Sequence, residues 1–464
     1  QNIYNKIYPL VRLKFKSVPD NRSPIVLEVV DNQIIDIDST TVPESLRGHV
    51  YDRLEPLLRK PKLRYDVYQR QTLLLGTVAG VSGQTDLKYD KTRYGYVLVP
   101  QISEIPLSTS TFVDNRLPYQ LGTFEATQSA GLSNQLGFGE QISFSLSSSF
   151  DFDRYFSGTS KYAAYSSDIV MPLGTDGLTW GAGYYSVRGR GSPSYGTFAD
   201  PVYDFIGQRF FGHYERATTH LQYPVLLTNE KSVKIQGLYD HIINRAATGP
   251  GSLGYDNITG YYFDAFRDRY NAGRITTEIK SNINDWEWGG SIMALSIFSH
   301  GLGGRTVDWE TANNQLLSRP YTTPYFSKFG LKLKATLGLP QDFQLTVIGR
   351  SQTSFGQPLP ITEMLSVDGW EAVSGYGAGT LNVDKGVTAR AELSRLVNIQ
   401  LGENLASTAP YIFASYGRGQ RSRPFEGEPP RLWAETFGGG FRADTNLTGM
   451  PFGETFSFEA GKNY

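Results

Sequence analysis

Residues 328–337 read Lys-Phe-Gly-Leu-Lys-Leu-Lys-Ala-Thr-Leu, and apolar side chains recur there at every second position. A period of two is typical of a β-strand with one apolar and one polar face. The segment that follows repeats the pattern, because Phe343, Leu345 and Val347 are separated by polar residues. The two segments therefore predict neighbouring strands.

The same period continues over most of the chain, from about residue 108 onward. Ile142, Phe144 and Leu146, for example, alternate with serines. In a soluble sandwich the apolar face would point to a core. In a membrane barrel it faces lipid, and the polar face lines a wet lumen.

The turns between the predicted strands alternate in length. The short turns are 136–139, 172–174, 227–229, 282–285 and 339–342, and the long connections are 189–205, 246–260, 300–324, 351–385 and 418–431. Outer-membrane barrels have short periplasmic turns and long external loops, whereas a sandwich has no reason for this alternation. The turn lengths therefore favour an all-β transmembrane barrel.

Composition excludes several classes of protein. The 464 residues carry a formal net charge of −1, so no basic field indicates nucleic-acid binding. The chain has no cysteine, which excludes disulfides, a thiol nucleophile and cysteine-ligated zinc. No run approaches the ~18 apolar residues that a membrane helix needs. With 49 Gly, 29 Tyr and 26 Phe, an all-β protein is expected.

Catalytic and metal-binding motifs are missing from the sequence. Neither G-x-S-x-G nor H-E-x-x-H occurs, and the five histidines have no metal-ligand spacing. His213, His220 and His241 are the histidines near regular strands, and we expect them to be polar lumen or interface residues. We therefore expect no enzymatic activity, no catalytic residues, no cofactor and no metal.

One long connection, residues 351–386, is too apolar to be a solvated linker. It contains Val367, Trp370, Val373 and Tyr376 among several glycines. Loops of this length in compact domains are unusual and mostly functional. We expect it to fold back into the barrel lumen.

The first hundred residues have a different pattern. Residues 34–104 predict a complete βααββ module, with helical spacing in 44–58 and 65–78. Residues 1–33 predict the last two strands of an incomplete module of the same kind. Residues 105–464 then form the barrel.

Several motifs, in order along the chain, carry a family resemblance. Gly369, Val373-Ser-Gly-Tyr376 and Asp384-x-Gly386 resemble the lumen-plug loop of the outer-membrane translocators of two-partner secretion, which export haemolysin-like and filamentous-haemagglutinin-like proteins. The turn 136–140 and the strand 410–417 resemble the family at the corresponding places. Residues 34–104 resemble a POTRA domain, the periplasmic module of these transporters, and 1–33 the C-terminal part of another.

The resemblance implies a fold, a location and partners. A barrel of this BamA-like superfamily has sixteen antiparallel strands, of which about fifteen are visible here, so we expect the last strand beyond Tyr464. The implied location is the bacterial outer membrane, with the POTRA material in the periplasm. The implied partners are the lipid bilayer and a secreted adhesin- or haemolysin-like passenger, with the transporter acting as a monomer.

The resemblance also assigns residues. The loop tip is Gly369, Val373, Ser374, Gly375 and Tyr376, its latch partner on the barrel strand is Phe413, Ser415 and Gly417, and the passenger-binding residues of the POTRA module are Leu54, Leu74 and Val97. In the family a loop Arg pairs with an Asp of the later strand, and both positions are serine here, Ser374 and Ser415. Either the two serines form a neutral latch, or the motif alignment is shifted.

Two other functions remain open at this stage. A passive outer-membrane porin would explain the loss of the Arg/Asp pair, and a BamA-like assembly factor would share the architecture. Conductance that does not depend on a passenger would favour the porin, and a large adhesin encoded nearby would favour the translocator.

Overall fold

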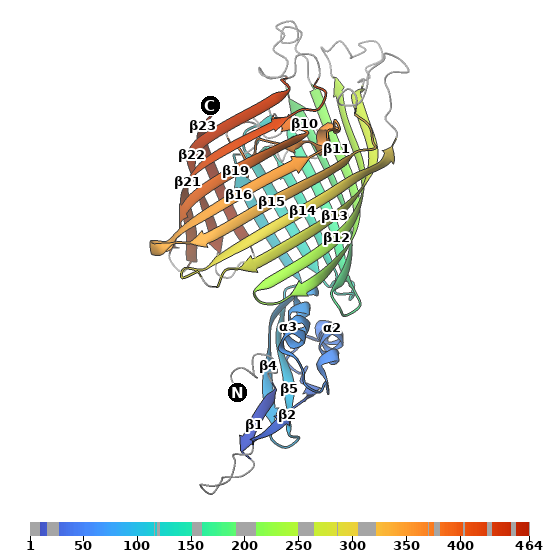
Figure 1. The fold of residues 1–464 in the computed structure, drawn as a ribbon, viewed down its shortest axis with the longest axis vertical. Helices are drawn as coiled ribbons and strands as arrows, with labels where there is room; N and C mark the ends of the chain where they lie inside the picture. Colours follow the sequence, from blue (N-terminus) through green and yellow to red (C-terminus); the bar gives the residue numbers. More distant parts are fainter. Residues whose placement is uncertain are drawn as a thin grey trace.

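The computed structural model consists of a β-barrel and a small α+β module at one of its ends (Figure 1). The residues it describes are 10–15, 27–115, 117, 121–150, 160–191, 210–248, 264–284, 286–304, 322–369, 371–374, 381–401, 404–424, 429–446 and 452–463. Among these residues no helix is long and apolar enough to cross a membrane.

The α+β module folds around two short helices packed on a three-stranded sheet. Its elements are β3 (Ile34–Ile37), α2 (Glu44–Leu54), η1 (Glu55–Leu57), α3 (Tyr65–Leu74), η2 (Leu75–Thr77), β4 (Val81–Asp90) and β5 (Gly95–Glu104). The sheet order is β3-β5-β4, with β3 parallel and β4 antiparallel to β5. Leu46, Val50 and Leu54 recur at helical spacing on α2 and are fully buried, so this face forms the core.

A separate hairpin precedes the module. Strands β1 (Val11–Phe15) and β2 (Leu27–Asp31) pair antiparallel in their own two-stranded sheet. Leu10 is buried in the core of the module, and the Asn32 side-chain amide donates a hydrogen bond of 3.1 Å to its carbonyl oxygen. The hairpin is thus anchored to the module at its base.

The barrel is one continuous sheet. Its strands are β6 (Leu107–Asp114), β7 (Glu125–Ser133), β8 (Gln141–Ser148), β9 (Tyr162–Leu173), β10 (Leu178–Gly191), β11 (Phe210–Leu227), β12 (Lys231–Thr248), β13 (Asp264–Asn282), β14 (Gly290–Gly304), β15 (Ser327–Gly338), β16 (Phe343–Thr353), β19 (Lys385–Arg395), β20 (Val397–Leu401), β21 (Asn404–Gln420), β22 (Arg431–Asn446) and β23 (Phe452–Asn463). Neighbouring strands pair antiparallel around the ring except at the seam, and β19 and β20 both pair with β21.

The seam follows from the number of strands. Strands β19 and β20 both pair with β21, so together they form one interrupted strand, and the described residues contain fifteen strands around the ring. With an odd number the first and last strands run in the same direction. Accordingly, β23 pairs with β6 in parallel, from Phe452 opposite Thr109 to Phe456 opposite Val113. The predicted all-β barrel is confirmed, and a further strand beyond Tyr464 stays a prediction.

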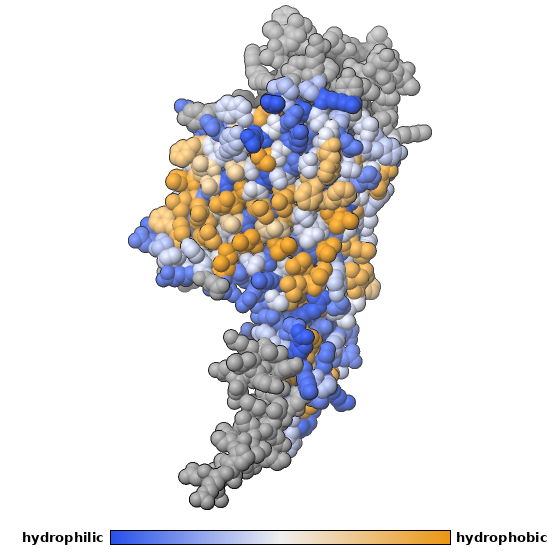
Figure 2. Space-filling model, in the orientation of Figure 1, coloured by the Kyte–Doolittle hydropathy of each residue, from blue (hydrophilic) through white to orange (hydrophobic). Residues whose placement is uncertain are grey.

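The alternation of the sequence separates two faces of the barrel wall. An apolar band crosses the face of the barrel seen in Figure 2, and exposed large apolar side chains of the wall include Ile275 and Leu333, which are 58% and 46% exposed. On the same strand as Leu333, Lys328 and Lys332 reach carboxylates inside the lumen. The register predicted from 328–337 is therefore the one observed.

The module docks against the short turns of the barrel. Leu74 is fully buried at this contact, where a Cβ on Gly177 would lie 2.5 Å from its side chain. Beside it, the Arg70 guanidinium donates to the carbonyl oxygens of Pro224 (2.7 Å) and Asp176 (3.1 Å) and to the Tyr223 hydroxyl (3.2 Å). In this fold Leu74 therefore packs on the barrel, a role that differs from the passenger contact predicted for it.

The turn 134–140 forms a second docking contact. The buried Glu140 carboxylate accepts hydrogen bonds from the backbone N–H groups of Leu136 (2.7 Å) and Phe138 (3.0 Å). These bonds fix the turn, and its Gly139 carbonyl oxygen accepts a hydrogen bond of 3.1 Å from the Ala79 N–H. The barrel and the module are thus held by hydrogen bonds from two different turns.

We predict that Arg70→Met loosens this docking. The side chain is only 20% exposed, so its partners lose their donors in a partly dry site, at a cost of about 1–3 kcal/mol. Hydrogen exchange of α3 should quicken while exchange in the barrel strands stays unchanged. The matched control is Arg64→Met near the start of the same helix, whose ion pair with Asp66 is largely solvated and should matter little. Equal exchange in both variants would contradict the docking role.

Candidate functional site

The loop between β16 and β19 lies inside the barrel. It leaves β16 after Thr353, forms the turn η5 (Ile361–Glu363), and then a small sheet of β17 (Leu365–Ser366) and β18 (Asn382–Val383) before joining β19. Its contacts are with lumen-facing residues of strands on several sides of the ring. Residues 370 and 375–380 lie outside the described part of the chain.

Apolar packing holds the middle of the loop against β21. Val367, Val373 and Val383 are all fully buried and form one cluster with Leu365 and Ala434. Glycines on β21 make room for them. A Cβ on Gly417 would lie 2.5 Å from Val367 and 3.1 Å from Val373, and a Cβ on Gly419 would lie 2.5 Å from Val383. Glycine at these positions therefore lets the loop reach the barrel wall.

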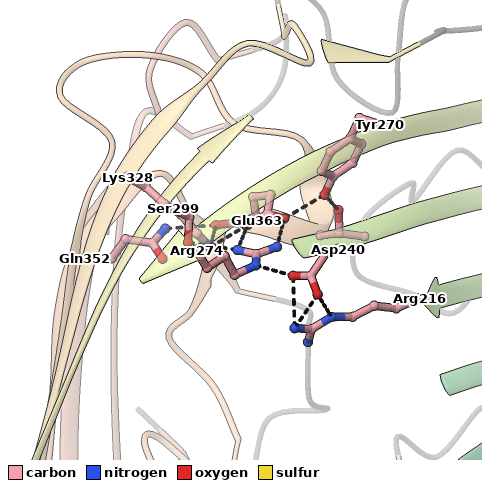
Figure 3. Close-up of polar contacts among 9 residues, drawn as sticks. Arg216, Asp240, Tyr270, Arg274, Ser299, Lys328, Gln352 and Glu363 are labelled. Atoms are coloured by element: carbon pink, nitrogen blue, oxygen red, sulfur yellow. Dashed lines mark hydrogen bonds and ion pairs between the residues drawn. The ribbon is translucent and has the colours of Figure 1, made fainter. Parts of the chain in front are cut away.

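A buried carboxylate anchors the first half of the loop. Glu363 at the end of η5 is 1% exposed and lies among side chains of β13 and β15 (Figure 3). Arg274 donates to both of its oxygens, at 2.6 and 2.9 Å, and the Lys328 ammonium lies 2.8 Å from Oε2. The Tyr270 hydroxyl adds a hydrogen bond of 2.8 Å to Oε1. Both carboxylate oxygens are thus occupied by donors from the wall.

The anchor continues into the barrel wall. Arg274 also bonds Asp240 on β12, and Arg216 on β11 donates two hydrogen bonds of 3.0 Å to the same carboxylate. Three cations therefore surround two carboxylates, Asp240 and Glu363. We call these five side chains and Tyr270 the Glu363 network. Burying this many charges is tolerable because each carboxylate is paired and hydrogen-bonded.

Further polar contacts fix the middle and the two ends of the loop. Glu371 forms an ion pair with Lys332 on β15. The Asp384 carboxylate is fully buried and accepts from the backbone N–H groups of Leu359 and Ser422, each at 2.7 Å. One carboxylate thereby ties the beginning of the loop to its end and to the connection after β21.

The loop tip meets an arginine of the barrel. Ser374 is 6% exposed, and its hydroxyl accepts a hydrogen bond of 2.7 Å from Arg390 on β19. Arg390 is the register partner of Ser415 on β21 and lies over the Phe413 ring, 3.9 Å from the ring centre. The structure thus brings together Val373, Ser374, Phe413, Ser415 and Gly417, with a cation between the two serines.

One carboxylate from another strand and one from its own strand neutralise this cation. Arg390 donates to Glu459 on β23 at 2.7 Å and to Glu392 on its own strand at 3.2 Å. Arg442 on β22 completes the group with a 2.8 Å bond to Glu392. We call Ser374, Arg390, Glu392, Arg442 and Glu459 the Arg390 network. It joins the loop tip to β19, β22 and β23.

The remaining predicted residues are placed as follows. Gly369 has a φ of +105°, which favours glycine and turns the chain toward the tip. Gly375 and Tyr376 lie outside the described residues. Leu54 is fully buried in the core of the module, so in this fold it is unavailable to a passenger. Val97 is half-buried on the sheet and lines a cleft of about 510 Å³ with Lys88 and Asp90.

Sequence reasoning did not identify the charged residues of the two networks as anchors. The alternation in 387–393 does put Arg390 and Glu392 on the polar face, so their lumen position was readable. Their partners were not, because Glu459 and Arg442 lie 69 and 50 residues away along the chain. Within the described residues no group of three or more His, Asp or Glu side chains could hold a metal ion.

Part of the chain matches a known protein family. A family model described as haemolysin secretion/activation protein ShlB/FhaC/HecB matches residues 274–440, a segment that contains the loop and, among its anchors, Arg274, Lys328 and Arg390. No curated protein sequence matches the chain. The predicted resemblance to the two-partner-secretion translocators is confirmed over this segment.

Solved structures share the whole architecture at low sequence identity. CdiB from Escherichia coli matches with a TM-score of 0.69 and 13% identity, covering 99% of this chain and 78% of its own. CdiB from Acinetobacter baumannii matches with a TM-score of 0.61 and 12% identity, covering 100% and 80%. BamA from Haemophilus ducreyi lacking POTRA domains 1–3 matches with 0.51 and 11%, covering 98% and 86%. These likenesses show that the chain has the fold of these barrels.

We predict that Glu363→Gln frees the first half of the loop. The change removes the carboxylate that pairs with Lys328 and one of the two carboxylates that pair with Arg274, and breaking a buried ion pair in this way costs about 3–5 kcal/mol. The variant should unfold at a lower temperature in detergent and open more often in planar-bilayer conductance. Glu287→Gln, in the exposed turn between β13 and β14, is the control and should change neither. Unaltered conductance at Glu363→Gln would show that this carboxylate does not hold the loop.

We also predict that an arginine on the loop can replace Arg390 as a cation of the Arg390 network. Ser374→Arg alone sets two guanidinium groups together and should cost roughly 1–3 kcal/mol of stability. Adding Arg390→Ser restores a single cation near Glu392 and Glu459, so the double variant should recover most of the loss. A double-mutant cycle of thermal unfolding measures this coupling. Simple additivity would mean that the two side chains do not meet.

Proposed function

We propose that the protein is an outer-membrane translocator of two-partner secretion that exports a large unfolded passenger through its lumen. The observation that carries the proposal is a loop held inside the barrel mainly by ion pairs and hydrogen bonds to the wall. Such a loop obstructs the path and can still be displaced, which is what a gated conduit for a polypeptide requires.

The contacts that anchor the loop to the wall are of a kind that allows the loop to be displaced. Each loop–wall hydrogen bond to a charged partner contributes a net stabilisation of only about 1.5–3 kcal/mol, because water can replace the partner. Glu363, Glu371 and Ser374 would each become hydrated if the lumen filled with water or chain. The barrel itself rests on backbone ladders that the loop does not share, so the loop can shift while the wall stays intact.

The α+β module is proposed to be a periplasmic POTRA domain that captures the passenger. Within the described residues β4 pairs only with β5, so its other edge is open. An extended chain can add to such an edge through backbone hydrogen bonds, which accept many sequences. Val97 and the cleft beside Lys88 and Asp90 would receive a passenger side chain. An adhesin- or haemolysin-like passenger fits this mode.

The two ends of the barrel differ, and we derive its proposed orientation in the membrane from this difference. The module lies at the short-turn end (Figure 1), so this end would face the periplasm and the long loops the exterior. One copy of the chain contains both the module and the lumen, and we propose that it acts as a monomer. The sequence has no nucleotide-binding motif, and folding of the passenger outside would drive transport.

The plugged lumen bears on the alternative functions. A passive porin needs a standing aqueous path, whereas here Val367, Val373 and Glu363 are buried between loop and wall. The likeness to BamA supports a shared fold and gives no separate reason for an assembly role. Export of a passenger is the function that uses the module, the lumen and the loop together.

We predict that deleting residues 34–104 abolishes export and leaves an inserted barrel. The core of the module contains no barrel residue, so the barrel can form without it. Export is scored by passenger in the medium, and insertion by heat-modifiable migration in gels. Normal export by the deletion variant would overturn the capture role.

A finer test locates the capture edge. Because the chain has no cysteine, Gln84→Cys on β4 gives a single exposed thiol for a photo-crosslinking reagent. We expect it to crosslink the passenger. Asp52→Cys, on the exposed face of α2, is the matched control and should not. Equal crosslinking at both positions would contradict strand addition at β4.

A further inference from the structure

The outward face of β10–β13 carries a cluster of cations near the long-loop end. Arg188, Arg245 and Arg269 lie on adjacent rows of this face, with Glu215 among them. Arg188 and Arg269 are exposed and have no carboxylate partner among the described residues. The three guanidinium groups extend across four strands, roughly 14 Å. Among the described residues of this cluster, Glu215 is the carboxylate, and it pairs with His213.

Histidines hold two of these arginines in place. Arg245 donates to His213 Nδ1 from Nη2 (2.8 Å) and Nε (3.1 Å), and His213 Nε2 faces Glu215 (2.9 Å) and Ser186 (3.2 Å). In the same way Arg269 Nε donates to His241 Nε2 at 3.3 Å. Each imidazole thus accepts a hydrogen bond from a guanidinium and orients it. Such a fixed array of donors matches the oxygens of a phosphate.

An apolar cleft begins beside this cluster. It has a volume of about 570 Å³ and lies on the same outward face of β10–β14. Its walls include Leu221, Tyr239, Ile275 and Phe298, which are 43–58% exposed, and its floor includes Gly237 and Gly273. A Cβ on Gly237 would meet nothing within 4 Å, so the glycine leaves an open recess in the apolar surface.

The cluster and the cleft are adjacent along the strands. On β13 Arg269 and Gly273 share the outward face and are four residues apart, roughly 14 Å. On β12 His241 follows Tyr239 of the cleft wall directly on that face. The cleft is lined mostly by apolar residues, and in Figure 2 hydrophilic residues lie above the apolar band toward the long-loop end. The order is that of an amphiphile, with a charged group at the boundary and an apolar chain below it.

We propose that this face binds a phosphate-bearing lipid, with its headgroup on Arg188, Arg245 and Arg269 and an acyl chain in the cleft floored by Gly237 and Gly273. Guanidinium groups form bidentate hydrogen bonds with phosphate. The cleft encloses apolar surface of the acyl chain. The width of the cluster fits a headgroup with more than one phosphate. The site is separate from the lumen, because its residues alternate with those of the Glu363 network.

Native mass spectrometry of the purified full chain in detergent tests the proposal. The probes are diphosphoryl lipid A, phosphatidylethanolamine and inorganic phosphate. We expect lipid A to be retained in preference to the other two. The triple variant Arg188→Gln/Arg245→Gln/Arg269→Gln should bind it at least about tenfold more weakly, since it loses the charge-assisted bonds. The control Lys231→Gln/Lys280→Gln removes charges at the other end of β12 and β13 and should bind normally.

A second variant tests the cleft. Gly237→Leu/Gly273→Leu fills the recess with side chains that have room to fit, so the barrel should still fold, as heat-modifiable migration will show. It should weaken lipid A binding and leave the weak binding of inorganic phosphate unchanged. Undiminished lipid A binding by either the arginine or the glycine variant overturns the proposal. So does phosphatidylethanolamine binding as tightly as lipid A, or free phosphate binding as tightly as the lipid.

Discussion

The rest of the structure depends on closing a sheet so that every strand has a partner on both sides. In hydrocarbon, an unpaired backbone N–H or C=O group costs several kcal/mol, so an open edge is not tolerated. Here the ring closes between β23 and β6 through only five paired positions, fewer than the eight that join β6 to β7. The parallel seam therefore carries the least backbone hydrogen bonding in the ring.

Closure also creates the chemistry of the lumen. Side chains from opposite sides of the ring converge on an interior that lipid cannot reach, so charged residues are tolerated there if they find partners. The loop supplies part of those partners. Glu363 neutralises Arg274 and Lys328, and Ser374 takes one hydrogen of Arg390. The wall and the loop thus satisfy each other, and moving the loop exposes cations that water must then solvate.

Periodic features were predictable from the sequence. The alternation of 328–337 gave the strand, its two faces and the lumen position of Lys328, and the apolar loop predicted an inward fold. Pairwise contacts were not predictable, because they depend on register around the ring. The tip was expected beside Ser415, and Ser374 instead bonds Arg390, the register partner of Ser415. In the same way, the sequence assigned Leu74 to the module, and its burial is explained only by the contact between the module and the barrel.

A period of two lets consecutive residues serve unrelated purposes. Along β12, Tyr239 and His241 face outward, and Asp240 between them belongs to the Glu363 network. Along β13, Arg269 and Gly273 face outward, and Tyr270 and Arg274 contact Glu363. The peptide backbone between such neighbours is fixed by ladders on both sides, so each face can vary while the other keeps its geometry. A short stretch of strand can therefore hold a plug on one face and meet lipid with the other.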